Sequence, residues 1–107
     1  MKLTAREKQI LTAVLALYEG KAELNIASQK IDNAQIKRAI WGGRTPPATA
    51  NETALWTMKN LARKFERHLK IEVIQSKDTG RGNFATFEFP EAGLDHIRRW
   101  DLEGKLS

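Results

Sequence analysis

The stretch TANETALWTMKNLARKFERHL, residues 49–69, decides the fold because it predicts one long amphipathic helix. Apolar side chains recur along it at spacings of three and four residues, as on the buried face of a helix. These core candidates are Ala54, Met58, Leu61, Ala62, Phe65 and Leu69. Thr49 and Glu52 have the spacing of a capping box, in which hydroxyl and carboxylate each accept a hydrogen bond from a free backbone N–H. A helix over 50–69 is therefore predicted.

The flank of this helix that faces away from Met58 combines polar, cationic and aromatic side chains. At about 100° per residue it consists of Thr53, Trp56, Asn60, Arg63 and Arg67, with Lys59 and Lys64 beside it. Guanidinium and amide groups read base edges in the DNA major groove, whereas lysines and hydroxyls contact phosphates. Trp56 is unexpected on such a face. The simpler alternative is that it packs against another element and that the charges are only solvated.

The length and composition of the chain limit what surrounds this helix. A chain of 107 residues suits a single domain, 1–107, with a modest hydrophobic core. There is no cysteine, which excludes disulfides and thiolate metal sites. No apolar run approaches the roughly 18 residues that a membrane span needs. We therefore expect a cytoplasmic, nucleoid-associated protein.

Positive charge is concentrated in the middle of the chain. Residues 30–81 hold 11 basic and 5 acidic side chains, and the remainder holds 7 and 8, so the net +5 divides into +6 and −1. Segregated positive charge attracts polyanions, and nucleic acid is the leading candidate ahead of an anionic membrane or an acidic protein. A basic surface that only keeps the protein in solution is the alternative.

Two shorter helices are predicted before the long one. A capping box at Thr4 predicts a helix over 4–19. A second capping box at Asp32 predicts a short helix over 33–41, which the glycine at position 42 would end. Three-helix folds of this kind can carry strands between and after the helices.

Three strands are predicted from alternating apolar and polar residues. A short strand is expected at 23–27, and two more at 71–75 and 84–89. The last two are joined by the glycine-containing stretch 76–84, so they predict a β-hairpin with a basic tip. A dinucleotide-binding loop would have to open a helix, whereas a strand follows here, so no cofactor is expected.

The predicted hairpin tip carries two cationic side chains. Lys77 and Arg81 are placed to reach phosphates or a narrow minor groove, whose negative potential favours arginine. Gly80 and Gly82 would permit positive φ and a close approach to a backbone. The alternative is a basic, solvated turn, and Asp78 at the same tip favours it.

A terminal helix is predicted after Pro90. Leu94, Ile97 and Trp100 recur on it at steps of three residues. We expect this helix to cover the sheet or the first helix. If the three side chains were exposed, they would instead form a homodimer interface, as in regulators that bind twofold sites.

The order of these elements resembles the winged helix-turn-helix DNA-binding domain, an α+β fold with a three-helix core and a C-terminal β-hairpin wing, here with an added terminal helix. LARKFE, residues 61–66, is similar to the Leu-Arg-(Arg/Lys)-Lys-Leu-Glu stretch of recognition helices in response-regulator effector domains. RGNFATF, residues 81–87, resembles the wing that follows. The link between the second and third helices is longer than the usual 3–4-residue turn, which leaves the contribution of Arg44 open.

The resemblance implies sequence-specific binding of double-stranded DNA by a small transcriptional regulator of bacterial or mobile-element type. The long helix would enter the major groove, and the tip 76–84 would contact the backbone or the minor groove. Base-edge contacts are expected from Trp56, Asn60 and Arg63. Phosphate contacts are expected from Thr53, Thr57, Lys59, Lys64, Arg67, Lys77 and Arg81.

Two other classes of function stay open. The first is a protein-interaction adaptor, because a fold does not fix a function. The second is a small basic ribonuclease, since phosphodiester cleavage can run on Arg, Lys, Tyr and His. An enzyme is nevertheless not expected, because no catalytic motif is apparent. His68 and His96 lie on different predicted helices without the spacing of metal ligands, so no metal is expected.

Overall fold

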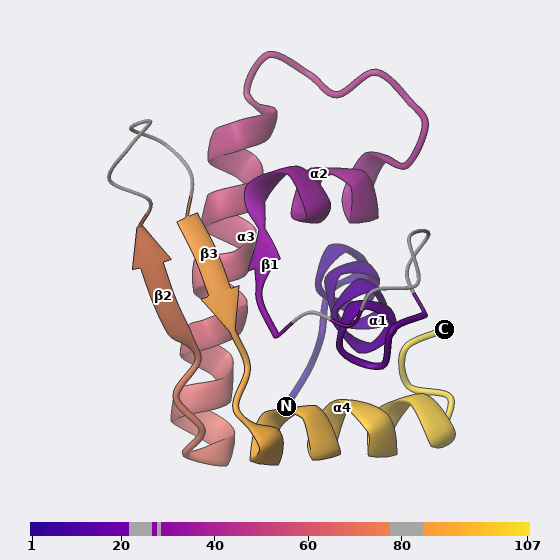
Figure 1. Ribbon diagram of the computed structural model, residues 1–107, viewed down its shortest axis with the longest axis vertical. Helices are drawn as coiled ribbons and strands as arrows, with labels where there is room; N and C mark the ends of the chain where they lie inside the picture. The colour runs from indigo at the N-terminus through magenta and orange to yellow at the C-terminus, as the bar shows by residue number, and fades with distance from the viewer. Residues whose placement is uncertain (22–26, 28, 78–84) are drawn as a thin grey trace.

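The computed structural model describes residues 1–21, 27, 29–77 and 85–107, and this part of the chain forms a small α+β domain (Figure 1). Four α-helices and one π-helical turn accompany a three-stranded antiparallel sheet. In chain order the elements are α1 (Ala5–Tyr18), β1 (Ile31–Asp32), α2 (Asn33–Trp41), α3 (Ala50–Lys64), η1 (Phe65–Leu69), β2 (Ile74–Lys77), β3 (Ala85–Glu88) and α4 (Glu91–Leu102).

Helices α1 and α2 begin at the two capping boxes that the sequence predicts. The Thr4 hydroxyl accepts a hydrogen bond from the Glu7 backbone N–H at 3.2 Å, and the Glu7 carboxylate accepts one from the Thr4 N–H at 2.8 Å. Asp32 and Gln35 repeat this exchange at the start of α2, at 2.8 Å in both directions. Both predicted starts are confirmed, because each local signature places its own backbone partner within reach.

Helix α3 begins where predicted, but the predicted capping box at Thr49 is wrong. The Thr49 side chain makes no capping hydrogen bond, and its backbone has φ −89° and ψ 12°. An N-cap residue normally has extended backbone, which directs its hydroxyl toward the free N–H groups of the first turn. The helical path then continues to Leu69 as predicted, although its last five residues form the π turn η1, which ends at Lys70 with φ 57°.

The sheet has the strand order β1-β3-β2, and it joins residues 31–32 to the hairpin formed by β2 and β3. Ile31 in β1 pairs with Phe87, and Ser76 in β2 pairs with Thr86, both in antiparallel register. The predicted hairpin is therefore present. Its first strand begins at Ile74, three residues later than expected, whereas β3 keeps the predicted alternation of buried and half-buried residues.

Strand β1 was not predicted from the sequence. The strand expected at 23–27 falls almost entirely outside the described residues, and residue 27 itself belongs to no strand. The observed β1 has only two residues. So short a strand is defined by its pairing with β3, more than 50 residues along the chain, rather than by any local pattern.

One hydrophobic core joins the helices to the sheet. Ile10, Met58, Phe65 and Phe87 are at most 1% exposed. The ring of Phe65 meets the ring of Phe89 edge to face at 5.1 Å between centroids. The Phe65 ring, at the start of η1, therefore packs against the segment that follows the hairpin.

A polar contact adds to this attachment of the hairpin. The hydroxyl of Tyr18, at the end of α1, accepts a hydrogen bond from the Phe89 backbone N–H at 2.8 Å. Burial raises the pKa of the Tyr18 phenol above its usual value.

Helix α4 covers the core at the foot of the domain, as Figure 1 shows. Leu94 is 4% exposed and Ile97 is fully buried, while half-buried Trp100 lies edge to face against Phe65 at 5.7 Å. The possibility of an exposed Leu94, Ile97 and Trp100 stripe is therefore wrong, because the chain's own core already buries these side chains. Homodimer formation itself stays a prediction.

An ion pair also holds α4 to α1. Arg98 donates to the Glu19 carboxylate at 2.9 Å from one helix to the end of the other.

Within the described part of the chain, no helix is both long and apolar enough to cross a membrane.

Candidate functional site

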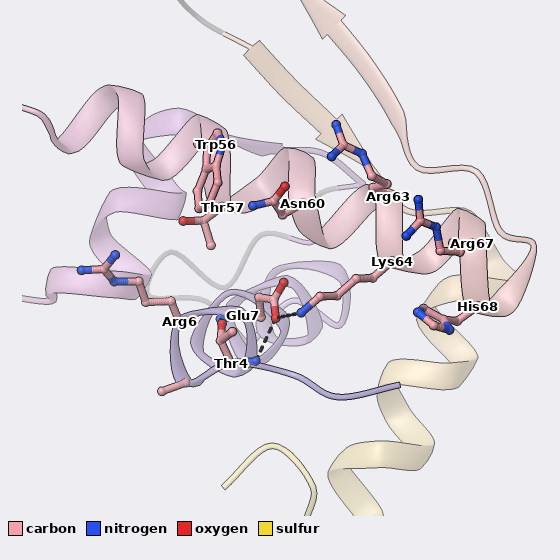
Figure 2. Close-up of a pocket in the computed structure, with 11 residues that line it drawn as sticks. Thr4, Arg6, Glu7, Trp56, Thr57, Asn60, Arg63, Lys64, Arg67 and His68 are labelled. Carbon is pink, nitrogen blue, oxygen red and sulfur yellow. Dashed lines mark hydrogen bonds and ion pairs between the residues drawn. The ribbon is translucent and has the colours of Figure 1, made fainter.

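A groove of about 620 Å³ runs between the polar flank of α3 and the first turn of α1 (Figure 2). Its walls come from residues about 50 positions apart in the sequence. The lining residues are Thr4, Ala5, Arg6, Glu7, Trp56, Thr57, Asn60, Arg63, Lys64, Arg67 and His68. Six of the ten residues predicted to bind DNA line this groove, five of them on α3 and Arg67 on η1.

The α3 wall of the groove is open to solvent. Trp56 is 69% exposed, and no other tryptophan, tyrosine or phenylalanine in the described part of the chain is exposed. Asn60 is half-buried, and Arg63 and Arg67 are exposed. The idea that Trp56 packs against another element is therefore wrong. Figure 2 shows the four side chains following one another along the same flank.

The opposite wall contributes Arg6, which sequence reasoning missed. Its guanidinium carbon lies 6.0 Å from the centroid of the Trp41 ring, at the end of α2. A cation in the first turn of a helix is opposed by the helix dipole, and this was the only local sign that Arg6 serves something other than helix stability. Its place opposite α3 depends on how the helices pack.

A buried ion pair forms the floor of the groove. Glu7 is 2% exposed, and its carboxylate accepts a hydrogen bond from the Lys64 ammonium at 2.6 Å. The same ammonium donates to the Lys2 carbonyl at 3.0 Å. Lys64 was predicted to contact phosphate. In the structure the Glu7 carboxylate neutralises this charge, and the ion pair links α1 to α3. The predicted phosphate contact of Lys64 therefore needs revision.

Thr57 also has a structural role in place of the predicted phosphate contact. Its side chain is 7% exposed, and its hydroxyl donates to the Thr53 backbone carbonyl at 2.7 Å. Little of the side chain is left to reach a ligand. Thr53 itself is half-buried, and Lys59 is exposed, but neither lines the groove.

Three guanidinium groups give the groove its charge. Arg6, Arg63 and Arg67 form no ion pair with any carboxylate in the described chain. The only acidic residue of the lining is Glu7, whose charge Lys64 balances. The surface is therefore strongly positive, and it places its exposed indole beside cations and an amide. Such a surface suits a ligand that combines anionic groups with flat rings.

Of the two predicted cations of the hairpin tip, only Lys77 lies in the described part of the chain. The Lys77 backbone pairs with Ala85 at the end of the ladder. Arg81 and the rest of 78–84, including both predicted glycines, lie outside the described residues. Whether tip and groove share a surface therefore stays a prediction.

The two histidines lie in different places. His68 lines the groove beside Arg67, whereas His96 lies on α4, 5.9 Å from the Trp100 ring between centroids. Among the residues with described positions, no group of three or more His, Cys, Asp or Glu side chains could hold a metal ion.

No family model matches the chain, and neither curated proteins nor solved structures give a significant match. What this site binds has to be inferred from its geometry and chemistry.

Proposed function

We propose that this protein binds double-stranded DNA in a sequence-specific manner, as a winged helix-turn-helix domain of the type found in small transcriptional regulators. The described elements follow the order on which the resemblance rests: helix, strand, helix, long helix and hairpin. A helix with its side chains is about 10–12 Å wide, which matches a major groove of about 12 Å. In this proposal α3 enters the major groove.

The observation that carries the proposal is the exposed indole of Trp56 between cationic and amide side chains. A surface that only keeps a protein in solution gains nothing from a tryptophan that is 69% exposed. A surface that recognises DNA bases does gain from an exposed tryptophan, because apolar contacts with base edges complement bidentate hydrogen bonds from arginine and asparagine. Asn60 and then Arg63 follow Trp56 along the same open flank.

The geometry changes the roles proposed for individual residues. Trp56, Asn60 and Arg63 keep their base-edge roles. Lys59 on α3 and Arg67 on η1 keep phosphate roles, and Arg6 joins them from α1. Lys77 and Arg81 remain proposed contacts of the hairpin. Thr57 and Lys64 no longer belong to the proposed binding surface, because the hydroxyl of Thr57 and the ammonium of Lys64 are hydrogen-bonded within the protein.

Selection from random duplex DNA, followed by a salt titration on the selected sequence, tests the proposal. We expect a consensus sequence and a linear fall of log K with log salt, at about 0.9 per phosphate contact. Arg67→Ala should reduce this slope by about 1, whereas Lys21→Ala, which removes a cation outside the groove, should leave it unchanged. Binding without a consensus, or a slope that Arg67→Ala and Lys21→Ala change equally, would contradict the proposal.

A protein-interaction adaptor is the second candidate, and the exposure of Trp56 also favours it, because tryptophan is enriched among the energetic centres of protein interfaces. An adaptor would bind its partner through the indole with little dependence on salt. It would return no consensus from the DNA selection. The same pair of experiments therefore separates the two candidates.

A further inference from the structure

A second hollow lies on the other side of the N-terminal segment from the groove. It has a volume of about 600 Å³ and lies between residues 1–3 and α4 with the turn that follows it. A smaller hollow of about 460 Å³ connects the two. This connecting hollow shares Thr4, Lys64 and His68 with the first groove and residues 1–3 with the second, so the three hollows adjoin one another along the N-terminal segment.

The charges of the second hollow are almost all positive. Lys2, Lys8, Arg99 and Lys105 line it, together with a single acidic residue, Glu103. The Glu103 carboxylate pairs with Lys105 at 2.9 Å. The other three cations form no ion pair within the described part of the chain.

These unpaired cations have no evident structural role. Arg99 is exposed on α4, where neighbouring Arg98 is the residue that pairs with Glu19, Glu91 and Asp95. Lys8 is half-buried and lies one residue after Glu7, whose carboxylate is occupied by Lys64. Three uncompensated cations around one hollow repel one another, and an anionic ligand would relieve this repulsion.

We infer that the second hollow binds the phosphate backbone of the same DNA duplex, beside the segment that α3 reads. This inference rests on the proposed function. A duplex carries one negative charge per about 1.7 Å of its axis, so phosphates are available to each of these adjoining basic hollows. The domain is 35 Å long, close to one turn of DNA at about 34–36 Å, so a single duplex can span its length.

The second hollow adds affinity and fixes orientation, but it does not read sequence. Lysine and arginine contacts with phosphate carry no base information, whereas they set the register of a protein on its duplex. Because the hollow lies on one side of α3 only, it makes the footprint asymmetric. It therefore gives a single copy of this domain a direction on its site.

Phosphate-ethylation interference on the selected duplex tests the inference with the double variant Lys8→Ala/Arg99→Ala. We expect the wild-type protein to show a central cluster of sensitive phosphates and a second cluster to one side. The double variant should lose only the second cluster, bind about tenfold more weakly, and lose about 1.8 from the salt slope. Arg67→Ala should instead weaken the central cluster.

A matched variant separates charge from packing. Lys8→Arg/Arg99→Lys keeps both charges and should retain the second cluster, and thermal unfolding should show that both double variants are folded. Unchanged interference in the folded alanine variant would overturn the inference while leaving the proposed function intact. Displacement of the wild-type protein from DNA by polyglutamate, with loss of that competition in the alanine variant and no change in interference, would assign the hollow to an acidic protein. Failure of wild-type protein to select any duplex would reject the proposed function and the inference with it.

Discussion

The two flanks of α3 differ more than any other pair of surfaces in this domain. On the inner flank Ala54, Met58 and Leu61 are fully buried. On the outer flank Trp56 is 69% exposed and Arg63 is exposed without a carboxylate partner in the described chain. Packing holds the inner flank, and nothing within the described residues covers the outer one. Substitutions on the inner flank should therefore change stability, and substitutions on the outer flank should change binding.

The border between the flanks is where this separation becomes informative. Thr57 and Lys64 lie on the wall and floor of the groove, yet their polar atoms are bonded within the protein. Residues of this kind look like ligand contacts in a helical projection. They act on binding only indirectly, by holding α3 in place.

The largest effect is expected from Phe65→Ala on the inner side. Phe65 is fully buried and meets the Phe89 and Trp100 rings, so its loss leaves a cavity between η1, the hairpin and α4. We expect the free energy of unfolding to fall by about 3–5 kcal/mol, measured by urea denaturation. Phe65→Leu should cost less than half as much. A fall below about 1 kcal/mol for the alanine variant would contradict this view of the core.

The next effect is expected from Trp56→Ala, and it should be confined to binding. The variant should bind the selected duplex more weakly by about 1–3 kcal/mol, measured by fluorescence anisotropy. Its free energy of unfolding should stay within about 0.5 kcal/mol of wild type, since the side chain is mostly exposed. Leu102→Ala is a matched control, because Leu102 is 87% exposed and lines none of the three hollows. Equal losses for both variants would remove Trp56 from the site.

Asn60→Ala sharpens the comparison within the outer flank itself. Loss of an amide that bonds a base edge should relax the preference at one position of the consensus, at a cost of about 1–2 kcal/mol on the preferred base. Lys59→Ala, at the neighbouring exposed position, should weaken all sequences alike. Repeating the selection with both variants provides the measurement. If both variants keep the full consensus, Asn60 reads no base.

A smaller effect on stability is expected from Lys64→Ala at the border. It leaves the buried Glu7 carboxylate with only its capping hydrogen bond to the Thr4 N–H. Because Lys64 is 31% exposed and water can partly replace it, we expect a loss of about 1–2 kcal/mol in unfolding free energy. The salt slope of DNA binding should not change. A slope reduced by about 1 in a fully folded variant would restore Lys64 to the phosphate contacts.

The sequence predicted the helices well because each one depends on local chemistry. Capping side chains at Thr4 and Asp32 bond backbone groups three residues away, and apolar spacing marks the buried face of α3. Thr49 has the same signature without the bond, because its backbone is not extended. A capping pattern thus locates a helix start more reliably than it predicts the hydrogen bond.

The rest of the site could not be predicted, because it depends on contacts between distant parts of the chain. Glu7 and Lys64 are 57 residues apart, and the position of Arg6 on the wall opposite α3 follows from the packing of α1 against α3. Periodicity assigns a residue to a side of its own helix. It does not say which other helix faces that side, so periodicity predicts Lys64 to be a surface cation and does not identify Arg6.

The smallest effect is expected from acidification at the junction of α1 and α4, away from both flanks of α3. Hydrogen bonds from Lys21 and then Arg98 lower the pKa of the Glu19 carboxyl below its ordinary value of 4.5. A lowered pKa in the folded state stabilises the fold above the unfolded value and loses this contribution as pH falls through the folded value. Because the ion pairs of Glu19 with Lys21 and Arg98 are largely solvated, we expect them to contribute only a few tenths of a kcal/mol to the free energy of unfolding. Urea denaturation of wild type and Glu19→Gln at pH 7 and near pH 3 should show a difference at neutral pH that vanishes in acid. A difference that persists or grows in acid would mean that Glu19 stabilises the junction through packing and not through its charge.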